Sequence, residues 1–289
     1  MKFSEIISSS WKEFSKKWKS ITSAMLVFYL IPALILLSYF LVWFSKNIVP
    51  TFLQINLEDA NSVYLLKDLF ISNYLALIIF ILLGFLVQLI SLIPKAGLIS
   101  LSKRTDYNFS KLTNEGLRKF PRMLKYIVTI LLVELLIFLP SIITSGIIIL
   151  KSYWVLLIIP ILLFIAGIIL SFIINIYWLF GAYICLESEK SVIKSLKKSF
   201  GLIKNKWWIS LGYILLYVLI VLGFELIFNI IEHIANLPLN ALLTNTVLIG
   251  IMTSFIFNFI KSVIETPFTI IFIKTMYINY SKKKAKSKK

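Results

Sequence analysis

The chain has 289 residues, of which 59% are hydrophobic and 15% are charged. Soluble domains are usually a little under half apolar and about a quarter charged, so this composition excludes a large water-soluble core and indicates an integral membrane protein. The formal net charge of +17 would also suit a nucleic-acid-binding protein, and the placement of the basic residues decides between these two classes.

Basic residues lie in blocks beside the apolar runs. Of the 30 lysines and arginines, 26 fall in four such blocks, which are residues 1–20, 95–125, 186–206 and 274–289. The connections between the blocks carry Lys46, Lys67 and Lys151, and Lys261 lies inside an apolar run. This alternation follows the positive-inside rule and argues against a nucleic-acid partner. We therefore predict a multi-pass protein of the cell membrane with both termini in the cytoplasm and an even number of crossings.

The N-terminal third of the chain begins with a basic amphipathic stretch. Residues 2–20 place aromatic and aliphatic side chains at helical spacing among lysines, which predicts a helix on the membrane surface. A first crossing is expected over 21–44, where Pro32 is expected to kink the helix. The return crossing is expected over 73–93, and Pro94 is expected to break the helix there.

The middle third repeats this order with a weaker surface helix. Residues 109–125 place apolar and basic side chains at helical spacing, although Pro121 disfavours a helix there. An outward crossing is expected over 126–148. The next apolar run, 155–185, is longer than one crossing needs, so we expect it to tilt, to kink at Pro160 or to continue into the cytoplasm.

The last third contains the clearest surface helix, within residues 187–206. Its predicted apolar face consists of Ile193, Leu196, Phe200, Ile203 and Trp207. A crossing is expected over 209–231, followed by a short external link with Glu232 and His233. The final apolar run, 242–280, returns to the cytoplasm.

These segments predict an all-α integral membrane protein with six transmembrane helices. We expect three hairpin units, each preceded by a basic amphipathic cytoplasmic surface helix. The predicted single transmembrane domain covers 1–281, with units of about 1–105, 106–186 and 187–281, and a basic cytoplasmic tail covers 282–289. Similar spacing in the first and third units suits an internal threefold repeat, and membrane-protein composition by itself is the alternative explanation.

The stretch 177–208 joins the acidic end of one crossing to a small, basic helix and then to two tryptophans that precede the next crossing. The residues that carry this pattern are Glu187 or Glu189, Ser195–Ser199 and Asn205–Trp208, to which the last crossing adds Pro267 and Thr275–Tyr277. In these features the chain resembles a broad family of uncharacterised prokaryotic multi-pass membrane proteins, which is related to the membrane domain of glycerophosphoryl diester phosphodiesterases. The resemblance implies six crossings and no transferable activity, because the hydrolase of the fused members is a separate soluble domain.

Four ionisable residues lie inside the predicted crossings, where each costs about 3 kcal/mol to bury on insertion scales. They form a candidate intramembrane polar cluster, which consists of Glu134, Lys261, Glu265 and Glu225. Lys261 lies one turn before Glu265, and Glu134 lies at a similar depth, so contact among these three is expected. Three interpretations stay open, which are a structural polar knot, a path for a substrate or protons, and a catalytic site.

Motifs for catalysis, cofactors and metals do not occur in the sequence. The single cysteine, Cys185, excludes a disulfide framework and a cysteine-based zinc site, and the single histidine, His233, excludes most histidine clusters. The sequence has no phosphate-binding glycine loop and no nucleophile elbow. We therefore predict no catalytic, cofactor-binding or metal-binding residue. Ten glycines without a GxxxG motif also predict few close helix contacts.

The leading functional hypothesis is a non-enzymatic membrane scaffold or accessory component, with anionic lipids of the bilayer and a membrane protein as partners. The basic and aromatic residues expected at the lipid surface are Lys12, Lys16, Lys17, Lys197, Lys198, Lys204, Trp18, Trp207 and Trp208. The alternative is a small secondary transporter or permease component that uses the intramembrane glutamate and lysine residues.

Overall fold

A computed structural model describes residues 2–47, 61–101, 108–150, 158–188, 191–242 and 246–286. Within these ranges the regular secondary structure is helical, without strands, so the predicted all-α class is confirmed. The elements in chain order are α1 (Phe3–Met25), η1 (Leu26–Leu30), α2 (Ile31–Asn47), α4 (Asn61–Ser100), α5 (Phe109–Leu150), α6 (Ile158–Trp178), α7 (Gly181–Ser188), α8 (Val192–Ile203), η3 (Lys204–Lys206), α9 (Trp207–Leu242) and α10 (Thr246–Lys286).

Six helical stretches in the described part of the chain are long and apolar enough to cross a membrane, in agreement with the predicted number. These stretches are Phe3–Phe40, Asn73–Ser100, Phe109–Ile148, Ile158–Ser188, Val192–Ala235 and Ile256–Ser281. Each exceeds the roughly 20 residues that a helix needs to span a bilayer core of about 30 Å. Composition and helix length together indicate a multi-pass membrane protein.

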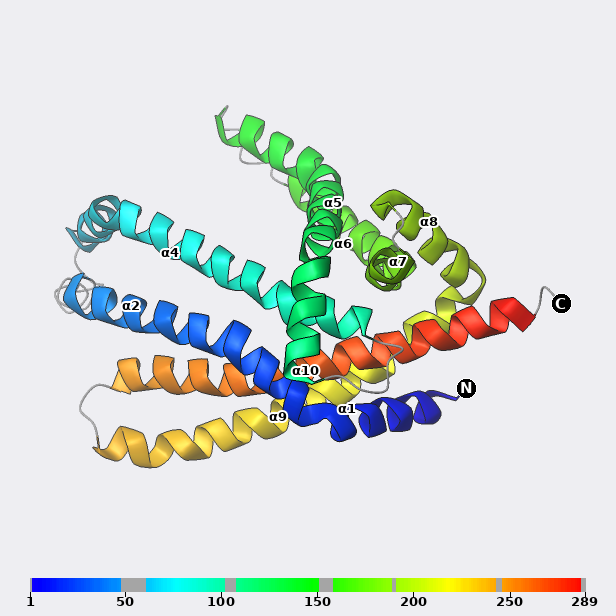
Figure 1. The fold of residues 1–289 in the computed structure, drawn as a ribbon. Helices are drawn as coiled ribbons and strands as arrows, with labels where there is room; N and C mark the ends of the chain where they lie inside the picture. The colour runs from blue at the N-terminus through cyan, green and yellow to red at the C-terminus, as the bar shows by residue number, and fades with distance from the viewer. Residues whose placement is uncertain are drawn as a thin grey trace.

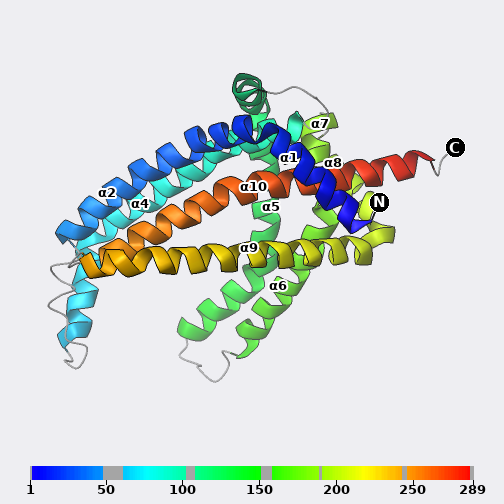
Figure 2. The same cartoon turned by 90° about the horizontal axis from the view of Figure 1, so that it is seen from below.

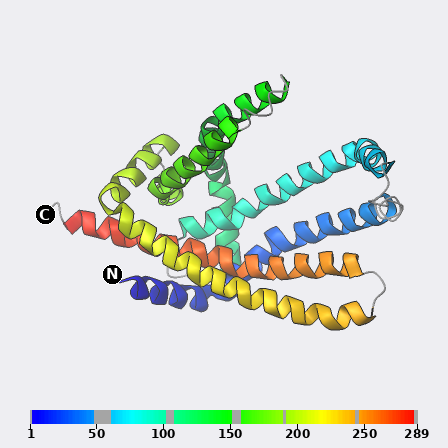
Figure 3. The same ribbon diagram turned by 180° about the vertical axis from the view of Figure 1, so that it is seen from behind.

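The long helices pack in three pairs that diverge from a common junction (Figure 1). α2 packs against α4, α5 against α6, and α9 against α10. Seen from below and from behind, the α5–α6 pair points in a different direction from the other two (Figures 2 and 3). Both ends of the described chain lie on the side of the junction opposite the far ends of the α2–α4 and α9–α10 pairs.

The largest cluster of buried side chains lies at this junction, and we call it the common core. It contains side chains from α1, α4, α5, α6, α7, α8, α9 and α10, among them Ile6, Leu98, Leu112, Phe180, Ile184, Ile203, Ile271 and Phe272. Away from the junction, the helix pairs expose large apolar side chains such as Ile81, Leu136 and Leu219. Continuous apolar exposure of this kind is expected where lipid replaces water as the solvent.

Pro32 lies beside the one irregular turn of the first crossing. Proline has no N–H group, so the carbonyl of Phe28 loses its helical donor. The chain forms the wide π-helical turn η1 directly before α2, in which Pro32 is the second residue. A π turn at this point agrees with the predicted irregularity at Pro32.

The helix break expected at Pro94 is wrong, because α4 continues through this proline. The residues that follow are fixed by packing, since Ala96 and Leu98 are buried in the common core. These tertiary contacts outweigh the local penalty for proline inside a helix, which is about 3 kcal/mol. α5 likewise continues through Pro121, and α10 through Pro267.

Two further helix ends differ from the sequence-based prediction. Glu232 and His233 were expected in an external link, but α9 continues to Leu242, and the carboxylate of Glu232 accepts a hydrogen bond from Ser254 of α10. The long apolar run that was expected to end at Cys185 is divided into α6 and α7. The chain turns at Leu179 and Phe180, so the run does not remain one helix.

Candidate functional site

An ion pair between α9 and α10 lies within the candidate membrane-spanning stretches. The ammonium nitrogen of Lys261 is 3.5 Å from a carboxylate oxygen of Glu225, and the Lys261 side chain is largely buried. Glu265 lies one helical turn from Lys261 on α10. All three side chains line the same cavity of about 370 Å³, so a second carboxyl group lies near this ion pair.

Glu134 does not contribute to this cavity, although contact with Lys261 and Glu265 was expected. Its carboxylate accepts a hydrogen bond from the Asn175 side chain at 3.0 Å and from the Ser171 hydroxyl at 3.5 Å. These bonds connect α5 with α6, whereas the Lys261 ion pair connects α9 with α10. The structure therefore divides the predicted four-residue cluster into two polar sites on different helix pairs.

The α9–α10 contact continues toward the junction through a chain of hydroxyl groups. Tyr217 Oη and Thr269 Oγ1 are 2.6 Å apart, and Thr269 Oγ1 also donates to the backbone carbonyl of Glu265 at 2.8 Å. The Tyr217 ring stacks on Phe272, with centroids 4.5 Å apart. These contacts connect the backbone at Glu265 with Tyr217 and Phe272 of the common core.

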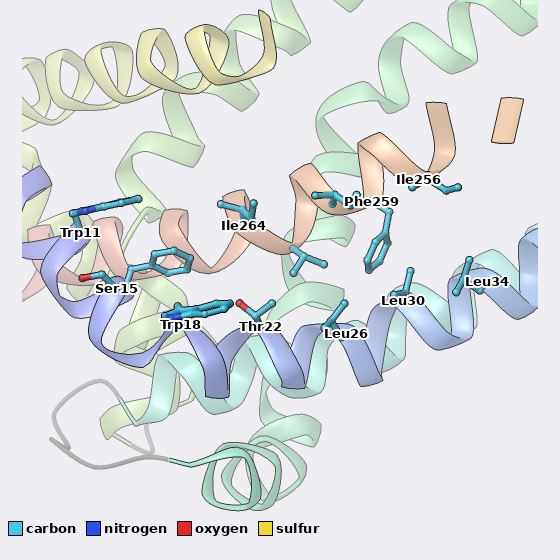
Figure 4. A pocket seen from close by; sticks show the side chains of 13 residues that line it. Trp11, Ser15, Trp18, Thr22, Leu26, Leu30, Leu34, Ile256, Phe259 and Ile264 are labelled. Carbon is cyan, nitrogen blue, oxygen red and sulfur yellow. The ribbon is translucent and has the colours of Figure 1, made fainter. Parts of the chain in front are cut away.

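An apolar groove of about 730 Å³ lies on the other side of Trp11, between the α1–α2 segment and α10. Figure 4 shows Trp11, Trp18, Leu26 and Leu30 of the first segment along one wall and residues of α10, such as Phe259, along the other. Because Trp11 and Ile264 also line the α9–α10 cavity, these side chains separate the groove from the three charged residues.

The predicted lipid-surface residues are exposed with two exceptions. The exposed members are Lys12, Lys16, Lys197, Lys198, Lys204, Trp18 and Trp208. The side chain of Lys17 is 12% exposed and lies 4.0 Å from Glu13, and Trp207 is partly buried against the common core. Trp208 is 78% exposed, as expected for an indole at a membrane interface.

The buried face of α8 differs from the predicted apolar face. Leu196 and Ile203 are buried inside the protein, whereas Ile193 is 62% exposed and Phe200 is 41% exposed. Ser195 and Ser199 are completely buried instead, four residues apart on one side of the helix. Two small residues at this spacing are a sequence signal for a close helix contact, and reasoning from hydrophobicity alone missed it.

Ser199 holds the broken segment between α6 and α7 in place. Its hydroxyl donates to the backbone carbonyl of Tyr177 at 2.8 Å and accepts from the backbone N–H of Phe180 at 3.1 Å. These two backbone groups flank the turn at which the helix is interrupted, so Ser199 supplies the partners that a continuous helix would have provided. Glu187 is in α7, and Glu189 lies outside the described residues.

A buried ion pair connects α1 to α10, and the sequence analysis did not identify it. The ammonium group of Lys274 is 1% exposed and donates to the carboxylate of Glu13 at 2.5 Å. Nearby, the hydroxyl of Ser10 donates to Thr275 at 3.2 Å. No local sequence signal could have paired Glu13 with Lys274, because they belong to opposite ends of the chain.

The described residues include no group of three or more histidine, cysteine, aspartate or glutamate side chains that could hold a metal ion. Comparisons with protein-family models, curated proteins and solved structures found no match. The resemblance to prokaryotic multi-pass membrane proteins therefore stays a prediction. The fold and its six candidate crossings define the class as a helical multi-pass membrane protein.

Proposed function

We propose that this protein is a non-enzymatic scaffold or accessory component of the cell membrane that binds anionic lipids. The lipids would bind at the end of the molecule that carries Lys12, Lys16, Lys197 and Lys198, which we call the basic end. In this proposal both termini are cytoplasmic, and the three helix pairs form three hairpin units, each preceded by a basic amphipathic surface helix. The observation that carries the proposal is the position of the exposed lysines. Lys12 and Lys16 on α1, and Lys197 and Lys198 on α8, lie on helices that contribute to the common core at the junction.

The geometry suits attraction of lipid headgroups rather than one deep binding site. Each well-placed cation near an anionic membrane surface contributes about 1 kcal/mol, and the contributions are spread over several helices. The helix pairs expose apolar side chains beyond the junction, so surrounding lipid has direct access to them. Such a protein would organise lipids and recruit a membrane-protein partner through its surfaces.

The test is enrichment of anionic lipid around the protein. The protein is extracted in native-lipid nanodiscs, and the retained lipids are quantified by mass spectrometry. Replacing Lys197, Lys198 and Lys204 together by glutamine should reduce the share of anionic lipid severalfold, since each lysine contributes about 1 kcal/mol, or roughly a fivefold preference, to the lipid beside it. The matched control replaces Lys46, Lys67 and Lys151, which lie on the predicted external connections. Equal lipid profiles for the two triple variants would refute the proposal.

A secondary transporter is the second candidate, and the cavity with Glu225, Lys261 and Glu265 favours it. Ionisable side chains inside membrane-spanning helices commonly mark ion or substrate paths. Two carboxyl groups beside one ammonium group leave one acid whose charge Lys261 does not neutralise. In proteoliposomes with an internal pH dye, Glu265→Gln should abolish proton-coupled uptake while the melting temperature is retained. If Glu265→Gln lost both uptake and folding, the role of these residues would be structural instead.

A further inference from the structure

A second polar cavity lies on α5, directly before the apolar part of that helix. It has a volume of about 340 Å³ and is lined by Arg118, Lys119, Pro121, Arg122 and Lys125, which we call the α5 basic pocket. Its lining contains four cationic side chains and no acidic one. None of these five residues belongs to the intramembrane polar cluster or to the lysines of the proposed lipid surface.

The charges in the α5 basic pocket favour an anion. Arg118, Arg122 and Lys125 follow one another at spacings of four and three residues, which places them on one face of the helix, where like charges repel. Glu115, paired with Arg118 at 2.7 Å, supplies one negative charge beside these positive ones. Lys119 is only 8% exposed. An anion in the cavity would relieve this repulsion, and guanidinium groups bind phosphate oxygens through two parallel hydrogen bonds.

The pocket is held rigid on both sides by contacts of α5 with other helices. Before it, Gly116 lies so close to α4 that an added Cβ atom would overlap the backbone carbonyl of Ile93. After it, the hydroxyl of Tyr126 donates to the carbonyl of Trp178 at 3.5 Å and lies beside Gly181 of α7. A site fixed in this way loses little conformational entropy when a ligand binds.

The predicted crossing over 126–148 places the pocket at the level of the headgroup layer of a bilayer. The apolar run of α5 begins at Tyr126, immediately after Lys125. The segment from Arg118 to Lys125 extends about 10 Å along the helix, and the headgroup layer on each side of the hydrocarbon core is roughly 5–8 Å thick. Phosphate groups of lipids, and phosphate compounds dissolved beside the membrane, both reach this level.

We infer that the α5 basic pocket is a specific binding site for a phosphate monoester group. The ligand is either the exposed phosphate of an anionic lipid or a soluble phosphate compound. Recognition would use the two guanidinium groups for the phosphate oxygens and the two lysines for charge neutralisation. The site would hold one anion stoichiometrically, unlike the exposed lysines of α1 and α8, so it does not depend on the proposed lipid-organising function.

The experiment compares two probes on the full-length protein in phosphatidylcholine nanodiscs. The first probe is radiolabelled inorganic phosphate, measured by equilibrium binding. The second is phosphatidic acid added as a minor lipid, with the number of retained molecules counted by native mass spectrometry. If one inorganic phosphate binds per protein, the natural ligand is a soluble phosphate compound. If one phosphatidic acid molecule is retained per protein, the natural ligand is a lipid. Failure of both probes to bind would overturn the inference.

Variants connect the binding to the pocket. The double variant Arg122→Gln with Lys125→Gln should lower the affinity for the probe by at least about tenfold, since each lost charge-assisted hydrogen bond corresponds to roughly that factor or more. Arg122→Lys should recover part of the affinity. The matched control, Lys46→Gln with Lys151→Gln, removes two charges from the predicted external side and should leave the stoichiometry at one. Equal weakening in both double variants would show nonspecific attraction and would also overturn the inference.

Melting temperatures of the nanodisc samples separate a binding defect from misfolding. If the double variant melts lower than the wild-type protein, Lys125→Gln alone replaces it, because Lys125 is exposed. This single variant should still lower the affinity for the probe severalfold. An unchanged affinity would contradict the assignment of the α5 basic pocket as the phosphate site. The lysine variants of the proposed function leave the α5 basic pocket intact, so the two proposals can fail separately.

Discussion

At the scale of single residues, buried side chains with one specific partner have the largest predicted effects. Ser199 satisfies two backbone groups at the turn between α6 and α7, and Lys274 places a full charge where almost no solvent reaches it. In both cases the cost of removing a partner exceeds the stability gained from forming the contact, because an unsatisfied group is left in the interior.

Ser199→Ala should lower the free energy of unfolding by roughly 2–4 kcal/mol, because the Tyr177 carbonyl and the Phe180 N–H both lose their partner. The measurement is reversible unfolding with sodium dodecyl sulfate in mixed micelles. Ser91→Ala is the matched control, since Ser91 is also buried but its hydroxyl donates within its own helix, to the carbonyl of Gln88. A similar loss in both variants would contradict the role assigned to Ser199.

Glu13→Gln should destabilise the protein by roughly 2–4 kcal/mol, because it removes the carboxylate that accepts the hydrogen bond of the buried Lys274 ammonium group. Lys274→Met should cost much less, since the Glu13 side chain is 25% exposed and also lies near Lys17. The double variant, measured in the same unfolding assay, should return close to the wild-type value. If the effects of the two substitutions simply add, the ion pair is not the cause.

The intramembrane charges show how far the candidate site could be predicted at this scale. Lys261 and Glu265 line the same cavity, because residues four apart on a helix share a face. Glu134 was wrongly added to them, because similar depth in the membrane does not determine which helices are neighbours. Glu225 is the actual partner of Lys261. Partner identity depends on helix order and rotation, which no local spacing specifies.

At the scale of helices, α4 and α5 cross at close range in the common core region. A Cβ atom on Gly97 would overlap the carbonyl oxygen of Leu112, and one on Gly116 would overlap that of Ile93. The absence of a GxxxG motif led to the prediction of few close helix contacts, and this prediction is wrong for α4 and α5. Each helix contributes one glycine to the crossing, so a motif within one helix is not required.

Gly97→Ala and Gly116→Ala should each destabilise the protein by about 3 kcal/mol or more, because a rigid backbone group has to move to admit the methyl group. Gly223→Ala on α9 is the control, since its added Cβ atom would have no neighbour within 4 Å. The control should be neutral or stabilising by up to about 1 kcal/mol through helix propensity. The check is the denaturant midpoint of all three variants, and unchanged midpoints for Gly97→Ala and Gly116→Ala would contradict the close crossing.

Helix boundaries were predictable where hydrophobicity determines them and unpredictable where packing does. The apolar runs gave the number of candidate crossings, and Pro32 indicated the irregular turn in the first of them. Pro94 gave a misleading signal, because the local cost of proline is smaller than the packing energy of the surrounding helix. The turn at Phe180 depends on Ser199, which is distant enough in the chain to escape any local pattern.

At the scale of the whole molecule, charge distribution predicts orientation, and the structure adds the divergence of the helix pairs. The single-domain prediction for 1–281 and the basic tail, of which 287–289 lie outside the described residues, are untested by the geometry. The direction of each pair could not be predicted from the sequence, because apolar helices carry no signal for the angle at which they leave the junction.

Orientation can be measured with single cysteines placed in a Cys185→Ala background. A membrane-impermeant maleimide should label the Lys12→Cys and Lys198→Cys variants from the cytoplasmic face of membrane vesicles, and the Lys46→Cys variant from the opposite face. All three positions are exposed, so differences in labelling report sidedness rather than burial. Labelling of Lys12→Cys and Lys46→Cys from the same face would contradict the proposed topology.

The confinement of the common core to one end of the molecule also has a mechanical consequence. A pulling force applied at the basic end acts first on that core. The far halves of the α2–α4, α5–α6 and α9–α10 pairs are in contact mainly with lipid. Once the core yields, the pairs no longer brace one another and should leave the bilayer as separate mechanical elements. The largest unfolding force is therefore expected at the basic end, and the opposite ends of the helix pairs should move under a smaller force.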